Sequence, residues 1–247
     1  MIEIAVVAEA ESDAILACRL ADRILLEEGP DWIEDHLLPV IRNWSGLEEG
    51  SAFTKWTSID DLFSRLSPRL RYRRRDTEQK KKPYYAVARK AILLAPLLRR
   101  QKPTALILMC DLDSQRERRE GLLQARQEEQ SNLTILIATP NPKREAWVLN
   151  GFLCENEREQ AELESVRQEI NFDPCRQAER LRYASQTSRA ERNPKDILRR
   201  LTDGSREREE KCWTQTPLAT LRERGEQTLL KDFLEDARAA LLPLFSK

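Results

Sequence analysis

Three short apolar segments stand out along the chain, and each is followed by a polar or acidic turn. Residues Ile2–Ala8, Thr104–Cys110 and Leu133–Ala138 are nearly uninterrupted runs of aliphatic residues. Such runs are typical of strands that are buried on both faces of a sheet. The pattern therefore predicts three buried strands, and Ala52–Thr57 is a candidate for a fourth.

Amphipathic segments separate these strands, with apolar residues spaced so that they share one face of a helix. Helices are predicted over residues 13–28, 58–66, 84–100, 114–130 and 143–152. Ser114 and Glu117 have the S-x-x-E spacing of a capping box, which predicts where the fourth of these helices begins. The alternation of strands and helices predicts a parallel sheet with right-handed crossovers.

Strand patterns end near residue 153, and the remainder of the chain has helical spacing. Helices are predicted over residues 155–170, 174–183, 194–201 and 228–242, and a flexible loop over 202–217. The predicted fold class is α/β, with a parallel sheet flanked by helices and a helical C-terminal extension. The predicted domains are 1–153, with an insertion at 29–82, and 154–247.

Charge restricts how this chain can bind a nucleic acid. Hydrophobic residues make up 40% of the 247 residues, and 42 Lys and Arg balance 42 Asp and Glu. The zero net charge excludes a uniformly basic binder, so contact with a nucleic-acid backbone needs a local patch. The densest basic stretch surrounds Tyr72 and is either such a patch or a solvated loop. Its candidate nucleic-acid-binding residues are Arg71, Arg73, Arg74, Arg75, Lys80, Lys81 and Lys82.

The remaining composition argues for a cytoplasmic protein with reduced thiols. The five cysteines are scattered without a C-x-x-C pair, which favours neither zinc nor disulfides. The apolar stretches are too short to cross a bilayer, and no export signal is visible, so no membrane partner is expected. The single histidine, His36, has no partners that indicate a catalytic triad. No P-loop motif occurs, so ATP hydrolysis would require a separate protein.

Acidic residues follow the predicted strands where a parallel sheet binds its ligands, at the carboxyl ends. Glu9 follows the first strand, Asp111 and Asp113 follow the second long run, and Glu145 lies beyond the third. Asp13 lies four residues after Glu9. Crowded carboxylates repel one another unless a cation neutralises them, and oxygen ligands suit Mg²⁺. Two such ions would activate water and stabilise the leaving oxygen in phosphodiester hydrolysis.

Each acidic residue also has a structural interpretation. Asp13 and Glu145 would complement the dipole of a helix at its N-terminus, and Asp113 would be a turn or capping residue. Glu9 is harder to explain in this way, because a carboxylate directly after a buried strand gains nothing from capping. The combination is more specific than any one member.

Two segments resemble the motifs of Toprim domains. Residues 6–13 (VVAEAESD) are similar to the first motif, and residues 106–113 (LILMCDLD) are similar to the second, a strand that ends in D-x-D. Ala10 stands where that first motif usually has glycine. The Glu9–Asp13 spacing and Glu145 are most similar to OLD-type nucleases. Residues 141–149 and 193–204 also resemble a small Toprim-like family encoded beside ATPases in anti-phage defence loci; the likeness covers mainly residues 1–150.

The resemblance implies a Mg²⁺- or Mn²⁺-dependent endonuclease acting on DNA or RNA, as effector of a two-component anti-phage system with a separate ATPase. It implies that Lys195, or else Lys211, stabilises the transition state beside the catalytic residues Glu9, Asp111 and Asp113. The metal ligands that it implies are Glu9, Asp13, Asp111, Asp113 and Glu145. The alternatives are a non-catalytic Toprim-like scaffold that binds nucleic acid or an ATPase, and a primase-like nucleotidyl transferase. A homodimer is left open.

Overall fold

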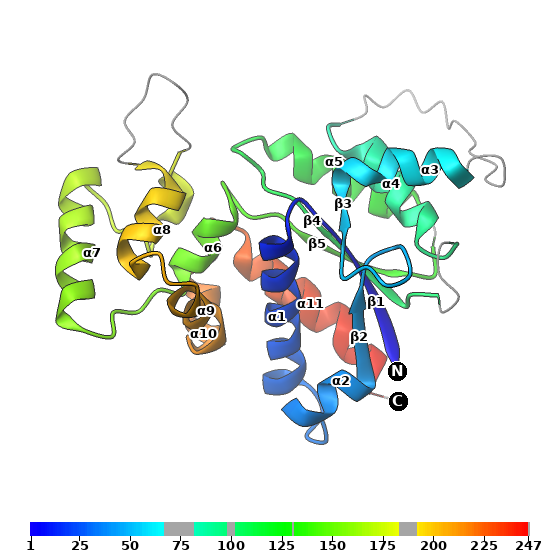
Figure 1. The fold of residues 1–247 in the computed structure, drawn as a ribbon, viewed down its shortest axis with the longest axis horizontal. Helices are drawn as coiled ribbons and strands as arrows, with labels where there is room; N and C mark the ends of the chain where they lie inside the picture. Colours follow the sequence, from blue (N-terminus) through cyan, green and yellow to red (C-terminus); the bar gives the residue numbers. More distant parts are fainter. Residues whose placement is uncertain (67–81, 98–101, 130, 183–191, 247) are drawn as a thin grey trace. The chain divides into compact units, whose positions relative to one another are not determined.

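The computed structural model describes residues 1–66, 82–97, 102–129, 131–182 and 192–246 (Figure 1). The chain divides into two compact units. Unit 1 comprises residues 1–110, 115–138 and 236–247, and unit 2 comprises residues 111–114 and 139–235. Among the described residues, no helix combines the length and apolar character needed to cross a membrane.

Unit 1 contains a five-stranded sheet in which every pairing is parallel, as the alternation of strands and helices predicts. The strand order is β2-β1-β4-β5, and β3 also pairs with β1. The strands are β1 (Ile2–Ala8), β2 (Arg42–Ser45), β3 (Thr54–Lys55), β4 (Ala105–Met109) and β5 (Thr134–Ala138). The predicted α/β fold with a parallel sheet, flanking helices and helical C-terminal part is therefore confirmed.

Alternation along the strands divides their buried side chains between the two faces of the sheet. Val7 of β1, Leu108 of β4 and Ile137 of β5 belong to one apolar cluster. Helices of the same cluster cover this face, and α1 (Glu11–Glu28) contacts β1 and β4. The covering helices are α3 (Ile59–Leu66), α4 (Tyr85–Leu94) and α5 (Arg116–Glu128). Burial on both faces explains why β1 and β4 are uninterrupted apolar runs.

The segment between α1 and β3 is more regular than its sequence suggests. It contains the short helices η1 (Asp35–Leu37) and α2 (Leu38–Ile41) before β2, and η2 (Trp56–Ser58) follows β3. The sequence pattern did not predict β2, because three of its four residues are only partly buried and no apolar run marks it. Asp22 of α1 secures β2 by binding the Arg42 guanidinium at 2.7 and 2.8 Å and the Trp44 indole N–H at 3.1 Å.

The predicted capping box at Ser114 is wrong. Asp113 and Ser114 have φ angles of +48° and +64°, so both adopt the left-handed conformation. A capping residue needs an extended backbone to direct its side chain at the first free N–H groups. The N-cap of α5 is instead Gln115, whose side chain makes no capping hydrogen bond. Ser114 is therefore not the N-cap residue of α5.

Unit 2 is helical. Its elements are α6 (Arg144–Asn150), α7 (Glu157–Ile170), η4 (Ala178–Arg180), α8 (Pro194–Thr202), α9 (Arg206–Thr214), α10 (Leu218–Arg224) and the start of α11 (Leu230–Phe245). The helices predicted over 155–170, 194–201 and 228–242 are confirmed. The helix predicted over 174–183 is wrong where the chain is described, because only the short η4 forms there. Trp147 of α6 is buried, stacks on Phe233 and donates to the Thr228 carbonyl, as expected of a core residue.

The predicted flexible loop over 202–217 is also wrong, because α9 forms within it. The Ser205 hydroxyl accepts the Arg208 N–H at 3.2 Å and caps the helix. Arg208 is buried, where its guanidinium binds the Glu159 carboxylate at 2.7 and 2.9 Å and lies 4.5 Å from the Phe152 ring. This ion pair lowers the pKa of Glu159. A highly charged sequence therefore folds here because its one buried arginine has a buried partner.

Unit 1 ends with the C-terminal part of α11. The Asp236 carboxylate accepts the Ile137 N–H of β5 at 3.3 Å and binds the Arg126 guanidinium at 2.8 Å. Since β5 is the last strand in the order, Asp236 satisfies a backbone group at the edge of the sheet.

Candidate functional site

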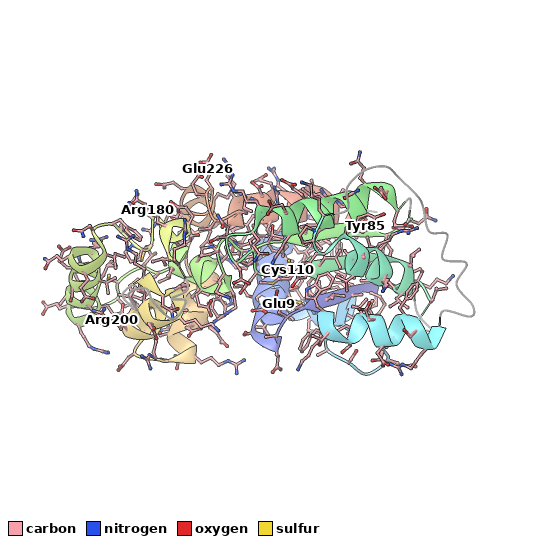
Figure 2. All side chains as sticks on the ribbon, turned by 90° about the horizontal axis from the view of Figure 1, so that it is seen from above. Glu9, Tyr85, Cys110, Arg180, Arg200 and Glu226 are labelled. Carbon is pink, nitrogen blue, oxygen red and sulfur yellow. The ribbon has the colours of Figure 1, made fainter. Side chains whose placement is uncertain are left out.

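The sheet of unit 1 places the ends of β1 and β4 side by side. Val7 lies opposite Leu108 in the parallel register. Glu9 and Cys110, both labelled in Figure 2, follow these two residues by two positions each. From Cys110 the chain continues directly into Asp111. The two strand ends that precede Glu9 and Asp111 are therefore neighbours in one parallel sheet.

Glu9 has a defined environment in unit 1. Its Oε1 atom accepts a hydrogen bond from the Tyr84 hydroxyl at 3.1 Å. The Tyr84 ring packs edge-on against Trp56, with centroids 5.4 Å apart, and the Arg118 guanidinium lies 5.5 Å from it. Burial and the negative charge of Glu9 raise the pKa of Tyr84, so its phenol stays a neutral donor. Tyr84 also has a φ of +64°, which is uncommon for a bulky residue.

Asp13 has the structural role that its position suggests. Its Oδ2 atom accepts the Ala10 N–H at 2.9 Å, which satisfies a backbone donor at the start of α1. Ala10 has φ −140° and ψ 166°, an extended conformation open to any residue. The backbone therefore does not require the glycine that the Toprim motif usually has here. A metal-binding role for Asp13 stays a prediction.

Within unit 2, the two aspartates of the D-x-D pair share one lysine. The Lys143 Nζ atom lies 2.6 Å from Asp113 Oδ1 and 3.6 Å from Asp111 Oδ2. The backbone N–H of Arg144 donates to Asp111 Oδ1 at 2.9 Å. Asp111 thus accepts from the N-terminal end of α6, while Lys143 lies between the two carboxylates.

Glu145, in the first turn of α6, is the third carboxylate of this group. Only 7% of the residue is exposed, and its Oε1 atom is 3.8 Å from the Arg144 guanidinium. Its Oε2 atom is buried and has no hydrogen-bond partner among the described residues. Burial acts to lower the pKa of Lys143, but the hydrogen bond to Asp113 and the charges of Asp111, Asp113 and Glu145 raise it. We call Asp111, Asp113, Glu145 and Lys143 the acidic cluster.

The chemistry of the acidic cluster suits a hard divalent cation. Its donors are carboxylate oxygens, which Mg²⁺ and Mn²⁺ prefer. Leaving a buried carboxylate oxygen without a hydrogen-bond donor costs about 1–3 kcal/mol or more of folding free energy. A cation bound to the Glu145 Oε2 atom, which has no such donor among the described residues, would offset this cost. Lys143 already places a cation among these groups. Across the described part of the chain, however, no three acidic, histidine or cysteine side chains form a ready-made metal site.

The lysine beside the carboxylates is not one that the sequence pointed to. Lys195 is exposed in the first turn of α8, and among the described residues its ammonium has no ion pair. Lys211 pairs with Glu155 at 3.2 Å. The strand-end pattern consists of carboxylates and therefore does not predict Lys143. Its position just beyond β5 and before α6 was the available signal.

A pocket of about 490 Å³ adjoins the acidic cluster within unit 2. Its lining residues are Asp113, Ser114, Pro142, Lys143 and Arg182. The Nη1 atom of Arg182 donates to the carbonyls of Glu179 at 2.6 Å and Leu181 at 2.8 Å. Among the described residues, no carboxylate pairs with the Arg182 guanidinium. Sequence reasoning did not identify Arg182, because nothing near it in the chain indicates a site.

The basic stretch lies largely outside the described residues. This applies to Arg71, Arg73, Arg74, Arg75, Lys80 and Lys81. Lys82 is described, and its ammonium lies 2.9 Å from the Glu120 carboxylate in unit 1. Its role in binding nucleic acid stays a prediction, like that of the others.

Comparison of the chain with protein-family models, with curated proteins and with solved structures finds no match.

Proposed function

We propose that the chain is a metal-dependent endonuclease that hydrolyses phosphodiester bonds of DNA or RNA. The observation that carries the proposal is the acidic cluster. Two of its carboxylates share the Lys143 ammonium, and the buried Oε2 atom of the third, Glu145, has no hydrogen-bond partner among the described residues. Asp111, Asp113 and Glu145 would hold Mg²⁺ or Mn²⁺. Glu9 and Asp13, which belong to unit 1, are the further ligands that the motif resemblance suggests.

The residues of the proposed site have different roles in binding and orienting a metal ion. The carboxylates supply the hard oxygen donors, and the Arg144 N–H orients Asp111. A bound divalent cation would neutralise the phosphoryl group and activate the attacking water. In unit 1, the Tyr84 hydroxyl donates a hydrogen bond to the Glu9 carboxylate and would help to orient it for a ligand.

The biological setting follows from the motif resemblance alone. We propose that this nuclease is the effector of a two-component anti-phage system in which a separate ATPase supplies nucleotide hydrolysis. Lys195 stays the candidate that the resemblance suggests for stabilising the transition state, and Lys143 is the lysine near the carboxylates.

The test combines cleavage with direct metal binding. The purified chain is incubated with plasmid DNA and with RNA in Mg²⁺ or Mn²⁺, and Mn²⁺ binding is measured by calorimetry. Asp111→Asn and Glu145→Gln should each abolish cleavage and weaken Mn²⁺ binding. Mn²⁺ affinity should fall by at least roughly 10- to 100-fold, which is the usual effect of losing a residue that hydrogen-bonds to a metal ligand.

Asp31→Asn is the matched control, because Asp31 is exposed and the change removes the same charge. It should leave cleavage and metal binding unchanged. Cleavage that survives in Asp111→Asn and Glu145→Gln would overturn the assigned site. Nucleic-acid binding without cleavage, alone and with the ATPase, would favour the scaffold, and primer extension with triphosphates would favour the transferase.

A further inference from the structure

We infer that the pocket beside the acidic cluster is a phosphate subsite in which Arg182 binds one phosphoryl group of a nucleic-acid backbone. The inference deepens the proposed function, on which it rests, by assigning a substrate contact. The residues that line the pocket include two cations, Lys143 and Arg182, and one hydroxyl, that of Ser114. These are the groups that bind phosphate oxygens in proteins.

Arg182 is oriented for this role by backbone carbonyls. Both described hydrogen bonds of its guanidinium use Nη1, which donates to the carbonyls of Glu179 and Leu181. Within the described residues, Nε and Nη2 have no acceptor. These two nitrogens form the side of the guanidinium that donates two parallel hydrogen bonds to one phosphate or carboxylate. The carbonyls fix the plane of the group and leave that side available.

Among the described residues, the Arg182 guanidinium also has no ion pair. The neighbouring arginine of η4, Arg180, stacks on Phe172, and Arg200 of α8 binds Glu162 and Glu169 (Figure 2 labels both arginines). Arg182, in contrast, contacts only neutral carbonyls among the described residues. Most arginines of this unit serve structural ion pairs, whereas the positive charge of Arg182 faces a pocket.

The other lining groups complete the preference for a phosphate. Asp113 would repel an anion, but Lys143 lies 2.6 Å from it and offsets its charge. Ser114, with its φ of +64°, caps no helix, so its hydroxyl is not committed to α5. A tetrahedral phosphate can accept from donors on several sides of a pocket, whereas a planar carboxylate offers fewer directions. The position next to the acidic cluster suits a phosphate that flanks or includes the scissile bond.

The experiment measures binding of a fluorescent single-stranded oligonucleotide by anisotropy, in EDTA and again with Ca²⁺. Arg182→Gln should weaken binding roughly tenfold to 100-fold, the range for hydrogen bonds to a charged group. It should also reduce the slope of affinity against salt by about 0.7, the contribution of one phosphate contact on a single strand. Arg182→Lys, which keeps the charge but loses the paired donors, should lose affinity and retain the slope.

Arg199→Gln is the control, because Arg199 is an exposed arginine of the same unit and the charge change is equal. A competition arm with inorganic phosphate separates two sources of the ligand. Effective competition that Arg182→Gln abolishes supports recognition of any phosphoryl group, and poor competition supports recognition of a polymer backbone.

Two results overturn the inference: Arg182→Gln binding like Arg199→Gln, or the wild type failing to bind the oligonucleotide under both conditions. The outcome is separable from the proposed function. If Arg182→Gln binds and cleaves nucleic acid like the wild type, the phosphate subsite is contradicted and the proposed nuclease activity is not. If binding depends on Arg182 but the protein cleaves nothing, the subsite is supported and the nuclease activity is contradicted. Thermal unfolding of each variant checks that it is folded.

Discussion

Lys143 is the residue that determines how the acidic cluster behaves without a metal. Its ammonium offsets the repulsion among Asp111, Asp113 and Glu145. The divalent cation that we propose for these carboxylates would have to compete with this internal charge. The lysine would therefore lower the metal affinity, because two cations so close together repel each other.

We expect Lys143→Met to bind Mn²⁺ about tenfold or more tightly than the wild type, since even a partly screened charge a few ångströms away costs that much. In EDTA the variant should unfold at a lower temperature, because buried carboxylates are left without their counter-ion. Adding Mn²⁺ should restore the lost stability. Calorimetry and thermal unfolding measure the two effects.

Lys231→Met removes an exposed lysine of unit 2 that has no role in the proposed site and serves as the control. It should leave Mn²⁺ affinity unchanged. Weaker Mn²⁺ binding by Lys143→Met would show that the lysine assembles the cluster and does not compete with the ion.

The site could be predicted only where residue type and strand position agree. Asp111, Asp113 and Glu145 were named because carboxylates beyond strand ends are a recognised pattern. In the structure, Lys143 lies 2.6 Å from Asp113 and 3.6 Å from Asp111. Arg182 could not be found in this way, because it reaches its pocket from a segment about 40 residues beyond Lys143 in the chain. The proposed role of Arg182 depends on the backbone carbonyls that orient its guanidinium, and these contacts cannot be read from the sequence.

At the scale of elements, the contact between α4 and α5 is unusually close at Gly121. A Cβ atom on Gly121 would lie 1.8 Å from the Pro83 carbonyl oxygen and 2.9 Å from the Tyr85 nitrogen. These are backbone atoms on either side of Tyr84, the residue that holds Glu9. A glycine in the middle of a helix therefore lets the turn before α4 approach and positions a residue of the candidate site.

Gly121→Ala should destabilise unit 1, although alanine favours a helix by about 1 kcal/mol. The backbone of residues 83–85 must move to admit the methyl group, and overpacking of this kind costs about 1–3 kcal/mol or more. Denaturant unfolding measures the loss of stability. Gln127→Ala, at an exposed position of the same helix, should change stability by less than about 0.5 kcal/mol. A Gly121→Ala variant more stable than the wild type would show that helix propensity outweighs the contact.

Helices and strands were predictable from sequence where their buried residues are mostly apolar. The three strands β1, β4 and β5 are almost wholly buried, and so their sequences are continuous apolar runs. β2 is partly exposed, and α9 buries an arginine in place of a leucine. Hydrophobic periodicity does not detect such elements, because each includes an arginine that pairs with an acidic residue distant in the chain.

At the scale of the whole molecule, the zero net charge makes nucleic-acid binding depend on where charges lie. Replacing Arg73, Arg74 and Arg75 with alanine should weaken oligonucleotide binding and flatten its salt dependence, by about 0.7 in slope for each lost contact on a single strand. Anisotropy titrations over a range of salt concentrations measure both quantities.

A second triple variant separates local contacts from the change in total charge. Arg158, Arg199 and Arg206 are all exposed, and their replacement by alanine removes the same three charges. An equal effect of the two triple variants would identify the basic stretch as a solvated loop.

The Asp236 carboxylate has a consequence for how copies of this chain can meet. Open sheet margins invite a strand from another molecule, which is one route to fibrils and to dimers joined by a continuous sheet. On the β5 side, Ile137 has its amide already engaged by Asp236. A visiting strand would have to displace a side chain that is also held by Arg126. Self-association by strand addition at this position is thus disfavoured, and a dimer would require another surface.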